Sequence, residues 1–372
     1  MKYCVRCVIP DSRPNVVLDA EGVCNACRTH DRRREVDWGA RADAFDRIVE
    51  QARERSDGHD CLIPGSGGKD STWQVVTCLE RGMTPLAVSW KPPARTEIGR
   101  QNLENLVSLG VDHVDYQVSP TVERKFLYAA LVRKGDPAIP MHMALFNIPL
   151  RLAVGLRIPL VVWGENSAVE YGSTDERLQG FTLGDAWLRE YGVTQGTTAA
   201  DWVSEELSER ELAPYHGPRA EELEAAGVTA VFLGEFFGWD PERSLRVARE
   251  HGFRSRPEGP KTGYYDYADI DDEFISIHHW LKWLKFGFTR TYDNLSLEIR
   301  NGRMTREEAV KILAERGDET PHDDIAAFCR FVGISEEHFF EVVERFRNAD
   351  VWKRRDGIWV IDGFLVPGWE WK

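Results

Sequence analysis

A glycine-rich segment at residues 64–71, Pro-Gly-Ser-Gly-Gly-Lys-Asp-Ser, holds the residue types in this sequence that are best suited to chemistry. It follows a short apolar run at 61–63 and opens a stretch that we expect to be helical. Glycine has no Cβ, so successive N–H groups can close around phosphate oxygens at a helix N-terminus, whose dipole favours anions. Lys69 and the hydroxyls of Ser66 and Ser71 add hydrogen-bond donors. The segment therefore predicts a pyrophosphate-binding loop.

The spacing separates this segment from two other phosphate-binding loops. It matches neither GxxxxGK[ST] nor GxGxxG. The string Ser-Gly-Gly-Lys-Asp-Ser instead resembles the loop of the ATP pyrophosphatases, which cleave ATP between its α and β phosphates and leave AMP on a substrate oxygen. The alternative is a plain glycine turn between a strand and a helix. The resemblance implies ATP binding by Ser66, Gly67, Gly68, Lys69, Asp70 and Ser71.

Four of the seven cysteines form two CxxC pairs, Cys4 with Cys7 and Cys24 with Cys27, separated by sixteen residues. Two such knuckles can present four thiolates to one tetrahedral ion, and Zn²⁺ is the ion that this spacing favours. An iron–sulfur cluster is the competing interpretation. The remaining cysteines are expected to be small buried apolar residues. The N-terminal segment therefore predicts a zinc-binding knuckle.

The sequence has 372 residues, of which 42% are hydrophobic, and its formal net charge is −14. These values predict a soluble globular protein of two or three domains. The negative charge opposes non-specific binding to nucleic acid or anionic membranes and favours small-molecule substrates. No apolar run approaches the length that crosses a bilayer, and the first residues lack a signal-peptide pattern. We expect a cytoplasmic protein.

Strand and helix patterns alternate after residue 36, which predicts an α/β fold with a parallel sheet covered by helices on both faces. Ligands of such a sheet bind at the carboxyl ends of its strands, where the glycine-rich segment lies. The predicted domains are a zinc knuckle at 1–35, a nucleotide domain at 36–190 and a mostly helical substrate- or partner-binding region at 191–372. Strands are expected at 61–64, 85–90, 111–118, 159–163 and 358–361, and helices at 42–53, 69–81, 98–109, 122–133, 144–156, 275–288, 303–316, 323–332 and 336–348.

Four strings spread along the chain carry a more specific resemblance. They are Cys-Val-Arg-Cys-Val-Ile-Pro-Asp at 4–11, Gly-Val-Cys-Asn-Ala-Cys at 22–27, Trp-Gly-Glu-Asn at 163–166 and Lys-Phe-Gly-Phe-Thr-Arg at 285–290. Each string is weak alone, but their joint order resembles the bacterial N-acetyl sugar amidotransferases of the ATP pyrophosphatase (PP-loop) superfamily. The resemblance implies a cytoplasmic step of surface-sugar biosynthesis that converts an acetamido group to an acetamidino group at the expense of ATP.

The resemblance also implies how nitrogen is supplied. It points to ammonia from a separate glutaminase subunit, delivered with a barrel-type subunit, and no glutaminase signature is visible in this sequence. The acceptor would be a nucleotide-linked or free N-acetyl sugar. An amide carbonyl is a poor electrophile, so its oxygen must first attack the α phosphate of ATP before ammonia can displace AMP. Lys69 and Mg²⁺ would stabilise the departing pyrophosphate.

Several other side chains are candidates for this site. Asp70 either ligates Mg²⁺ or caps the helix that follows it. Glu165 and Asn166 come directly after the strand at 159–163, at the ligand-binding edge of the sheet, and are predicted to be catalytic and substrate-binding respectively. Substrate binding by cations is predicted for Lys261, Arg290 and Arg300, each with a solvated or paired cation as the alternative. His278 and His279 are interpreted as helix-packing residues, and His142 as a structural histidine, with a position near the site as the alternative.

Two other functions share some of these features. An ATP-dependent sulfur transferase acting on tRNA or a small metabolite would use the same adenylation step, although the acidic composition disfavours RNA. A non-catalytic scaffold could use the zinc knuckle to bind a glutaminase, but the intact loop argues for chemistry. The sequence therefore predicts an amidotransferase, with sulfur transfer as the alternative.

Overall fold

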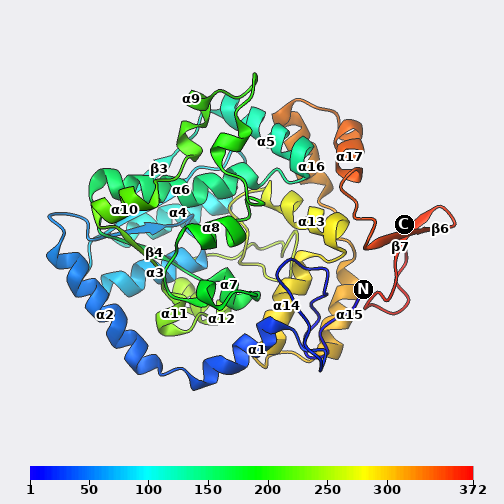
Figure 1. Ribbon diagram of the computed structural model, residues 1–372, viewed down its shortest axis with the longest axis horizontal. Helices are drawn as coiled ribbons and strands as arrows, with labels where there is room; N and C mark the ends of the chain where they lie inside the picture. Colours follow the sequence, from blue (N-terminus) through cyan, green and yellow to red (C-terminus); the bar gives the residue numbers. More distant parts are fainter. Residues whose placement is uncertain (372) are drawn as a thin grey trace.

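The computed structural model describes residues 1–371 of the chain. At its centre is a parallel sheet of five strands in the order β3-β2-β1-β4-β5 (Figure 1). This arrangement, with helices on both faces, confirms the predicted α/β class. The strands are β1 (Cys61–Pro64), β2 (Pro85–Trp90), β3 (Asp112–Tyr116), β4 (Leu160–Trp163) and β5 (Thr229–Phe232).

Successive residues of a strand point to opposite faces of the sheet, and both faces are buried here. Leu62 of β1 joins the apolar cluster formed with α5 and α6. Its neighbours Cys61 and Ile63 join the cluster on the other face, formed with α2, α3 and α4. Burial on both faces explains why β1 reads as an uninterrupted apolar run. The covering helices are α2 (Trp38–Glu54), α3 (Lys69–Leu79), α4 (Glu97–Ser108), α5 (Pro120–Lys134) and α6 (Ile139–Leu156).

The region after the sheet is mostly helical. Helices α13, α16 and α17 share one apolar cluster with part of α5, and an antiparallel hairpin, β6–β7, follows them. The N-terminal segment packs against α14 and α15, as Figure 1 shows for the dark blue chain beside those helices. These elements are α13 (Ile275–Phe286), α14 (Arg290–Arg300), α15 (Arg306–Arg316), α16 (His322–Val332), α17 (Glu336–Glu344), β6 (Trp352–Arg355) and β7 (Ile358–Ile361).

Short helices fill the connections. They are α1 (Asn25–Arg32), α7 (Ser167–Glu170), α8 (Asp185–Tyr191), α9 (Glu209–Leu212), α10 (Ala220–Ala226), α11 (Gly234–Phe237) and α12 (Pro241–Glu250), with 3₁₀ turns η1 (Arg33–Glu35), η2 (Glu176–Gln179), η3 (Ala199–Trp202) and η4 (Ala213–Tyr215). Helix α12 packs against α3. It was not predicted, because half of its residues are charged and it buries only Pro241 and a narrow stripe at Ser244, Leu245 and Ala248.

The sheet continues past residue 190, where the predicted nucleotide domain ends. Strand β5 pairs with β4 from Leu160 opposite Thr229 to Trp163 opposite Phe232. The apolar run at 228–233 is visible in the sequence, but no regular strand–helix alternation precedes it, so the pattern does not assign it to the sheet. The boundary of the sheet therefore lies about one strand further along the chain than the predicted domain boundary.

Within residues 1–371, one helix, α6, is long and apolar enough to cross a membrane by length and composition. The core helix of a soluble protein meets the same test. Helix α6 packs against β1, β2 and β4, and 44% of its apolar window is buried. Its apolar character is accounted for by its place over one face of the sheet.

Candidate active site and metal centre

The glycine-rich loop joins β1 to α3 at the carboxyl edge of the sheet. Gly67 has a φ of +85°, and a Cβ there would lie 2.4 Å from the Leu103 backbone and 2.6 Å from that of Asn102 in α4. A Cβ at Gly65 would collide with Ser71. Glycine is therefore needed at 67 for the left-handed backbone and the close approach of α4, and at 65 for the close approach of Ser71.

The backbone N–H groups of this loop are free. Those of residues 66–71 donate no hydrogen bond to any other group in residues 1–371. The turn itself is held by side chains, since the hydroxyls of Ser71 and Thr72 each donate to the Gly68 carbonyl at 3.0 Å. Free N–H groups at the N-terminus of α3 are the donors that an anion such as pyrophosphate needs.

Lys69 and Asp70 lie side by side at the start of α3 and form an ion pair. The Lys69 ammonium lies 5.5 Å from the ring centre of Trp239 and 5.9 Å from that of Tyr267. The Trp239 indole donates to Asp70 Oδ1 at 2.9 Å. Gly68, not Asp70, is the N-cap of α3, so the capping alternative for Asp70 is wrong. Its carboxylate remains a candidate for Mg²⁺.

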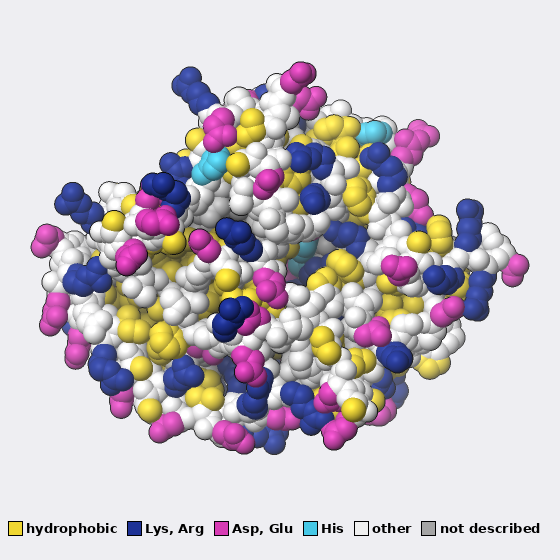
Figure 2. All heavy atoms as spheres, viewed as in Figure 1, with side chains coloured by type: hydrophobic (Ala, Val, Ile, Leu, Met, Phe, Trp, Pro, Cys, Tyr) yellow, Lys and Arg dark blue, Asp and Glu magenta, His cyan; other side chains and the backbone are white. Residues whose placement is uncertain are grey.

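The loop opens into a cavity of about 730 Å³. Figure 2 shows a hollow near the middle of the molecular face, with basic and histidine side chains visible inside it. Residues from both halves of the chain line the cavity. They include Ser66, Lys69, Asp70, Gln74, Asp136, His142, Glu165, Tyr171, Trp239, Tyr267, Asp269, His278, Lys282, Lys285, Arg290 and Asp293, together with Arg13 from the N-terminal segment.

Glu165 follows β4 directly and lines the cavity, as its position in the sequence predicts. Burial, and then the neighbouring Asp70 carboxylate, raise the pKa of Glu165 to about 7. Lys69 and Arg290 oppose that rise. Glu165 therefore lies within electrostatic reach of both the loop and α14, and it can hold a proton near neutral pH.

The wall opposite the loop is formed by α13 and the start of α14. His278, Lys282 and Lys285 of α13 all line the cavity. Their spacing of four and three residues places them on one helix face, which complements the buried apolar stripe of Ile277, Leu281 and Leu284. Sequence analysis assigned His278 to packing and did not interpret Lys282 and Lys285, although this spacing was the available signal.

Asp293 is the central carboxylate of this second wall, and its side chain is fully buried. Arg13 donates from Nε to Asp293 Oδ1 at 2.7 Å, while Lys282 and Arg290 each lie 3.7 Å from Oδ2. Asp293 Oδ2 has no hydrogen-bond partner within residues 1–371. Burial lowers the pKa of Lys282 to about 8 against the attraction of Asp293. The wall thus holds several cations close together around one buried anion.

The two walls meet at Asp269. Its Oδ2 accepts a hydrogen bond from Arg290 Nε at 3.2 Å. Burial disfavours its charged form, but Arg290, His279 and then Lys69 outweigh burial and hold the pKa of Asp269 below its ordinary value. The same segment approaches the loop through Asp271, where burial raises the pKa of the carboxyl and the nearby Ser66 side chain opposes that rise. The segment around Asp269 therefore closes the cavity between the loop and α14.

Among the predicted substrate-binding residues, Arg290 lines the cavity, and three others do not. Asn166 is fully buried and caps α7; its amide donates to Leu178 and Gly180 carbonyls and accepts from Trp187. Every polar group of its side chain is used within the protein. Direct substrate contact by Asn166 is therefore not supported, since its position holds the chain after Glu165 in place.

Lys261 and Arg300 are paired cations outside the cavity. Lys261 forms an ion pair with Asp324 and lies 3.6 Å from Glu273. Arg300 is buried and donates from Nη2 to the Glu170 carbonyl at 2.7 Å. Burial opposes the charge of Arg300, but the nearby cysteine thiolates raise its pKa above the ordinary value. The alternative of a structurally paired cation fits both residues.

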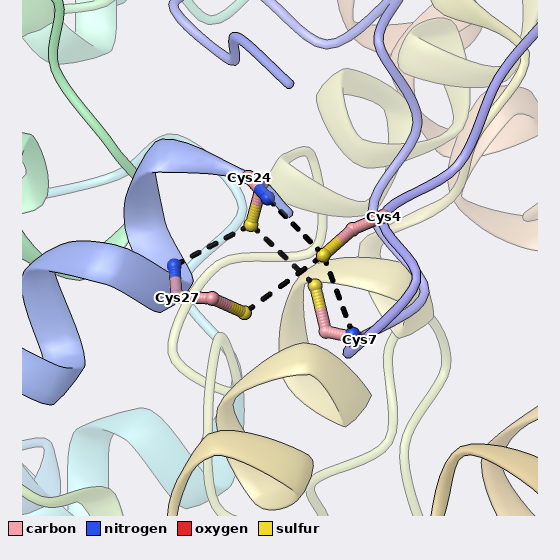
Figure 3. Close-up of side chains that lie close together, drawn as sticks. All are labelled: Cys4, Cys7, Cys24 and Cys27. Carbon is pink, nitrogen blue, oxygen red and sulfur yellow. Dashed lines mark hydrogen bonds between the residues drawn. The ribbon is translucent and has the colours of Figure 1, made fainter. Parts of the chain in front are cut away.

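The four predicted metal ligands converge on one point (Figure 3). The Sγ atoms of Cys4, Cys7, Cys24 and Cys27 all lie within 4.8 Å of one another, and all four residues are buried. Cys7 and Cys24 are 3.7 Å apart at sulfur, and Cys4 and Cys27 are 4.0 Å apart. A tetrahedral Zn²⁺ with Zn–S bonds of about 2.3 Å requires S···S separations of about 3.8 Å. The donor set and its spacing therefore fit a metal such as zinc.

The cysteine cluster is joined to the cavity by the chain between its two CxxC pairs. Arg13 lies on that chain and contacts both Asp293 and the ring of Tyr171, 5.1 Å from its guanidinium carbon. Arg306 of α15 donates to the Cys7 carbonyl at 3.0 Å and fixes the knuckle from the other side. The N-terminal segment is thus part of the cavity wall, which sequence analysis did not predict.

Comparison with known proteins finds a family match for part of this chain. Residues 261–363 match a family model described as "LPS biosynthesis protein WbpG-like, C-terminal domain". No curated protein matches the chain. The matched region contains α13 and α14, which form the second wall of the cavity. The match supports a place for this chain in a family of sugar or lipopolysaccharide biosynthesis, and it includes three of the cations that line the cavity, Lys282, Lys285 and Arg290.

Proposed function

We propose that this chain is an ATP-dependent amidotransferase of the ATP pyrophosphatase type, acting on an N-acetyl sugar in lipopolysaccharide or surface-sugar biosynthesis. One observation carries the proposal: a loop with free N–H groups at residues 66–71 opens into the same cavity as α13 and α14 of the lipopolysaccharide-biosynthesis region. The loop supplies an anion site and the opposite wall supplies polar and charged groups for an acceptor. Both halves of an adenylation reaction therefore have a place in one cavity.

In the proposed reaction the acetamido oxygen attacks the α phosphate of ATP, and the bond from that phosphorus to the bridging oxygen of the β phosphate breaks. Pyrophosphate leaves, and AMP remains on the former carbonyl oxygen. The N–H groups of Ser66, Gly67 and Gly68 and the ammonium of Lys69 stabilise the negative charge that develops on pyrophosphate. Ammonia then attacks the activated carbon, AMP departs, and the acetamido group becomes an acetamidino group.

Metal ions have two proposed roles. Asp70 would hold Mg²⁺ together with phosphate oxygens, because its carboxylate borders the loop and the cavity, and the ion would offset phosphate charge. Zn²⁺ in the four-cysteine centre has a structural role, since the knuckle is too small to fold alone and its metal-binding energy contributes to folding. Glu165, at the end of β4, is proposed to serve the ATP end of the cavity.

The proposal includes the wider organisation of the enzyme. Residues 1–35 form the zinc knuckle, 36–190 with β5 form the nucleotide domain, and the remaining helices bind substrate and partners. Ammonia comes from a separate glutaminase subunit and a barrel-type subunit, and the protein acts in the cytoplasm. These partners follow from the resemblance to the sugar amidotransferases.

The test is incubation of the purified zinc-loaded protein with ATP, Mg²⁺, ammonium and a panel of acetamido sugars, followed by mass analysis. We expect AMP, pyrophosphate and a sugar product about one mass unit lighter, because NH replaces O. A mass gain of about sixteen, from sulfur in place of oxygen with a sulfur donor, would establish the sulfur-transferase alternative instead. ADP with phosphate as the stoichiometric products would refute the adenylation chemistry.

A further inference from the structure

The cavity contains a histidine–carboxylate pair that the adenylation step does not use. His278 lies on α13, and Asp136 lies in the connection between α5 and α6. The His278 Nδ1 and Asp136 Oδ1 atoms are 2.9 Å apart, and both residues line the cavity. A carboxylate in this position accepts a hydrogen bond from Nδ1–H and so favours the tautomer that leaves the imidazole lone pair on Nε2.

Asp136 is held firmly in place. Its Oδ1 also accepts the backbone N–H of Ala138 at 3.2 Å, and its Oδ2 accepts from Gln195 at 3.4 Å. The Lys285 ammonium lies 3.6 Å from Oδ2. A buried carboxylate with this many donors keeps its charge and orientation, so it can fix the ring of His278.

The second ring nitrogen of His278 is left for a ligand. Nε2 has no hydrogen-bond partner within residues 1–371, and it is not one of the enclosed polar atoms that lack a partner. It therefore has access to the cavity. An oriented imidazole with a free Nε2 inside a substrate-sized cavity has the geometry of a proton acceptor.

Two neighbouring histidines lack this arrangement. His279 uses Nδ1 with Thr262 at 2.9 Å, and its Nε2 lies 3.8 Å from Asp269. The Nδ1 of His142 faces the Ala138 carbonyl at 2.8 Å, and within residues 1–371 this ring forms no hydrogen bond or ion pair with a carboxylate. His142 instead packs against the ring of His278, with centroids 5.5 Å apart. His278 is thus the imidazole in this wall that combines a carboxylate partner with a free nitrogen.

We propose that His278 takes the proton that ammonia loses when it attacks the adenylated substrate, and that Asp136 is the positioning residue that orients it. The proposal rests on the proposed function and names the second half of that reaction. The ammonia nitrogen bonds to the imidate carbon, one N–H proton passes to His278 Nε2, and the C–O bond breaks with its electron pair leaving on AMP. The products are a neutral amidine group, AMP and a protonated His278.

The surroundings of His278 suit this role. The charged and titratable groups that face it are Asp136 from the α5–α6 connection, His142 from α6, and His279, Lys282 and Lys285 from α13. Burial and the two lysines lower the pKa of His278, while Asp136 opposes them. The imidazole is therefore neutral, and able to accept a proton, at neutral pH.

The experiment measures the two half-reactions separately in wild type and in His278→Asn. Sugar-dependent exchange of labelled pyrophosphate into ATP, without ammonia, reports adenylation. Amidine formation with ammonium reports the whole reaction. We expect the exchange rate to stay within a few-fold of wild type and amidine formation to fall about 100-fold or more, which is typical of losing a general base.

Two further variants separate a chemical role from a structural one. His278→Gly leaves space for free imidazole, which should restore part of the amidine formation. His338→Asn, on α17 and outside the cavity, is the matched control and should leave both half-reactions unchanged. Melting temperatures for all variants show which of them are folded.

Asp136→Asn adds a readout in pH. The carboxylate raises the pKa of His278, so its removal should move the acid limb of amidine formation, expressed per unit of free ammonia, to lower pH. A role in packing alone would lower the amplitude without moving the limb.

The proposal is overturned if folded His278→Asn loses exchange and amidine formation in parallel, if it loses neither, or if imidazole fails to restore folded His278→Gly. If the wild-type protein shows neither sugar-dependent exchange nor amidine formation, the proposed function itself is wrong, and the proposed role of His278 is wrong with it.

Discussion

The two walls of the cavity are built in different ways. The loop wall is one contiguous segment, residues 65–71, whose shape is fixed by glycine and by the adjoining helix α3. The opposite wall gathers side chains from the N-terminal segment, the α5–α6 connection, the segment around Asp269 and helices α13 and α14. Its shape is fixed by ion pairs between residues as distant as Arg13 and Asp293.

This difference separates what a local motif can encode from what only the folded chain can assemble. In the proposed function, phosphate is bound by backbone groups, which any sequence with glycine at the right positions can present. The proposed acceptor is bound by side chains that must balance each other's charge in a buried setting. We therefore expect loop substitutions to change chemistry with little effect on folding, and substitutions in the opposite wall to change both.

The largest expected effect is loss of the metal centre. Cys24→Ser should abolish stoichiometric zinc binding and lower the stability of the whole N-terminal segment, because metal-binding energy in a small knuckle is folding energy. Arg13 should then lose its place in the cavity. Elemental analysis and unfolding by denaturant provide the measurement, with Cys329→Ser, outside the cluster, as the control. Retained zinc and stability with lost activity would contradict the structural role.

Asp293→Asn tests the ion pairs of the second wall. The change leaves Arg13, Lys282 and Arg290 around a neutral side chain in a buried site. Breaking a buried ion pair from one side costs about 3–5 kcal/mol, so unfolding should occur at clearly lower denaturant concentration and sugar binding should weaken. Asp362→Asn, in an exposed pair with Arg355, is the control. Equal stability of the two variants would mean that this wall does not depend on its central carboxylate.

Lys69→Ala tests the loop wall. Removal of one electrostatic stabiliser of the departing pyrophosphate should lower turnover by about 10²–10³. The melting temperature should change much less than in Asp293→Asn. AMP release and a thermal melt give both quantities, and Lys353→Ala on the exposed hairpin serves as the control. Turnover within a few-fold of wild type would show that this ammonium does not act on the phosphates.

Gly67→Ala separates two requirements of the loop. Gly67 and Gly110 both have positive φ, at +85° and +97°, but a Cβ at Gly110 meets nothing within 4 Å. Gly110→Ala therefore measures the backbone cost, about 1 kcal/mol, whereas Gly67→Ala adds the collision with α4. We expect the extra loss of stability in Gly67→Ala to be about 1–3 kcal/mol, accompanied by weaker ATP binding. Identical losses in both variants would mean that α4 yields without cost.

Glu165→Gln should give the smallest change in stability, and it should raise stability at neutral pH where the other variants lower it. The pKa of Glu165 is raised to about 7, so wild type loses stability as pH rises from the ordinary value of about 4.3 towards 7. The variant should therefore be more stable than wild type by about 1 kcal/mol or more at neutral pH, with no advantage below about pH 4. Turnover should fall. Urea unfolding across this range checks the sign, and an advantage confined to low pH would contradict it.

The sequence allowed the contiguous features to be predicted. Strands β1 to β4, the loop and the four-cysteine cluster lie where local patterns place them, because apolar runs, glycine spacing and CxxC pairs act over a few residues. Of the second wall, only Arg290 was predicted, because the groups of this wall pair with residues far away in the sequence. His278 was assigned to packing, although it lines the cavity.

Asn166, Lys261 and Arg300 were predicted to bind substrate, but the structure directs their side chains to other protein groups. Each has a side chain able to bind a sugar, but its contacts lie with Trp187, Asp324 and Glu170 respectively. The residue type shows that a side chain can form hydrogen bonds or ion pairs, whereas its burial and neighbours decide whether it contacts a substrate or other protein groups. Strand β5 is likewise defined by its pairing with β4, and this pairing cannot be predicted from the short apolar run of β5 alone.

The central claim is that the two walls bring the acetamido oxygen of a sugar to the α phosphate of ATP. The most direct measurement uses an acceptor sugar whose acetamido oxygen carries the heavy isotope of oxygen, with ATP, Mg²⁺ and ammonium. The account predicts that the label appears in the phosphate of AMP, in step with amidine formation. Label retained in the sugar, or released to pyrophosphate, inorganic phosphate or water with unlabelled AMP, would contradict it.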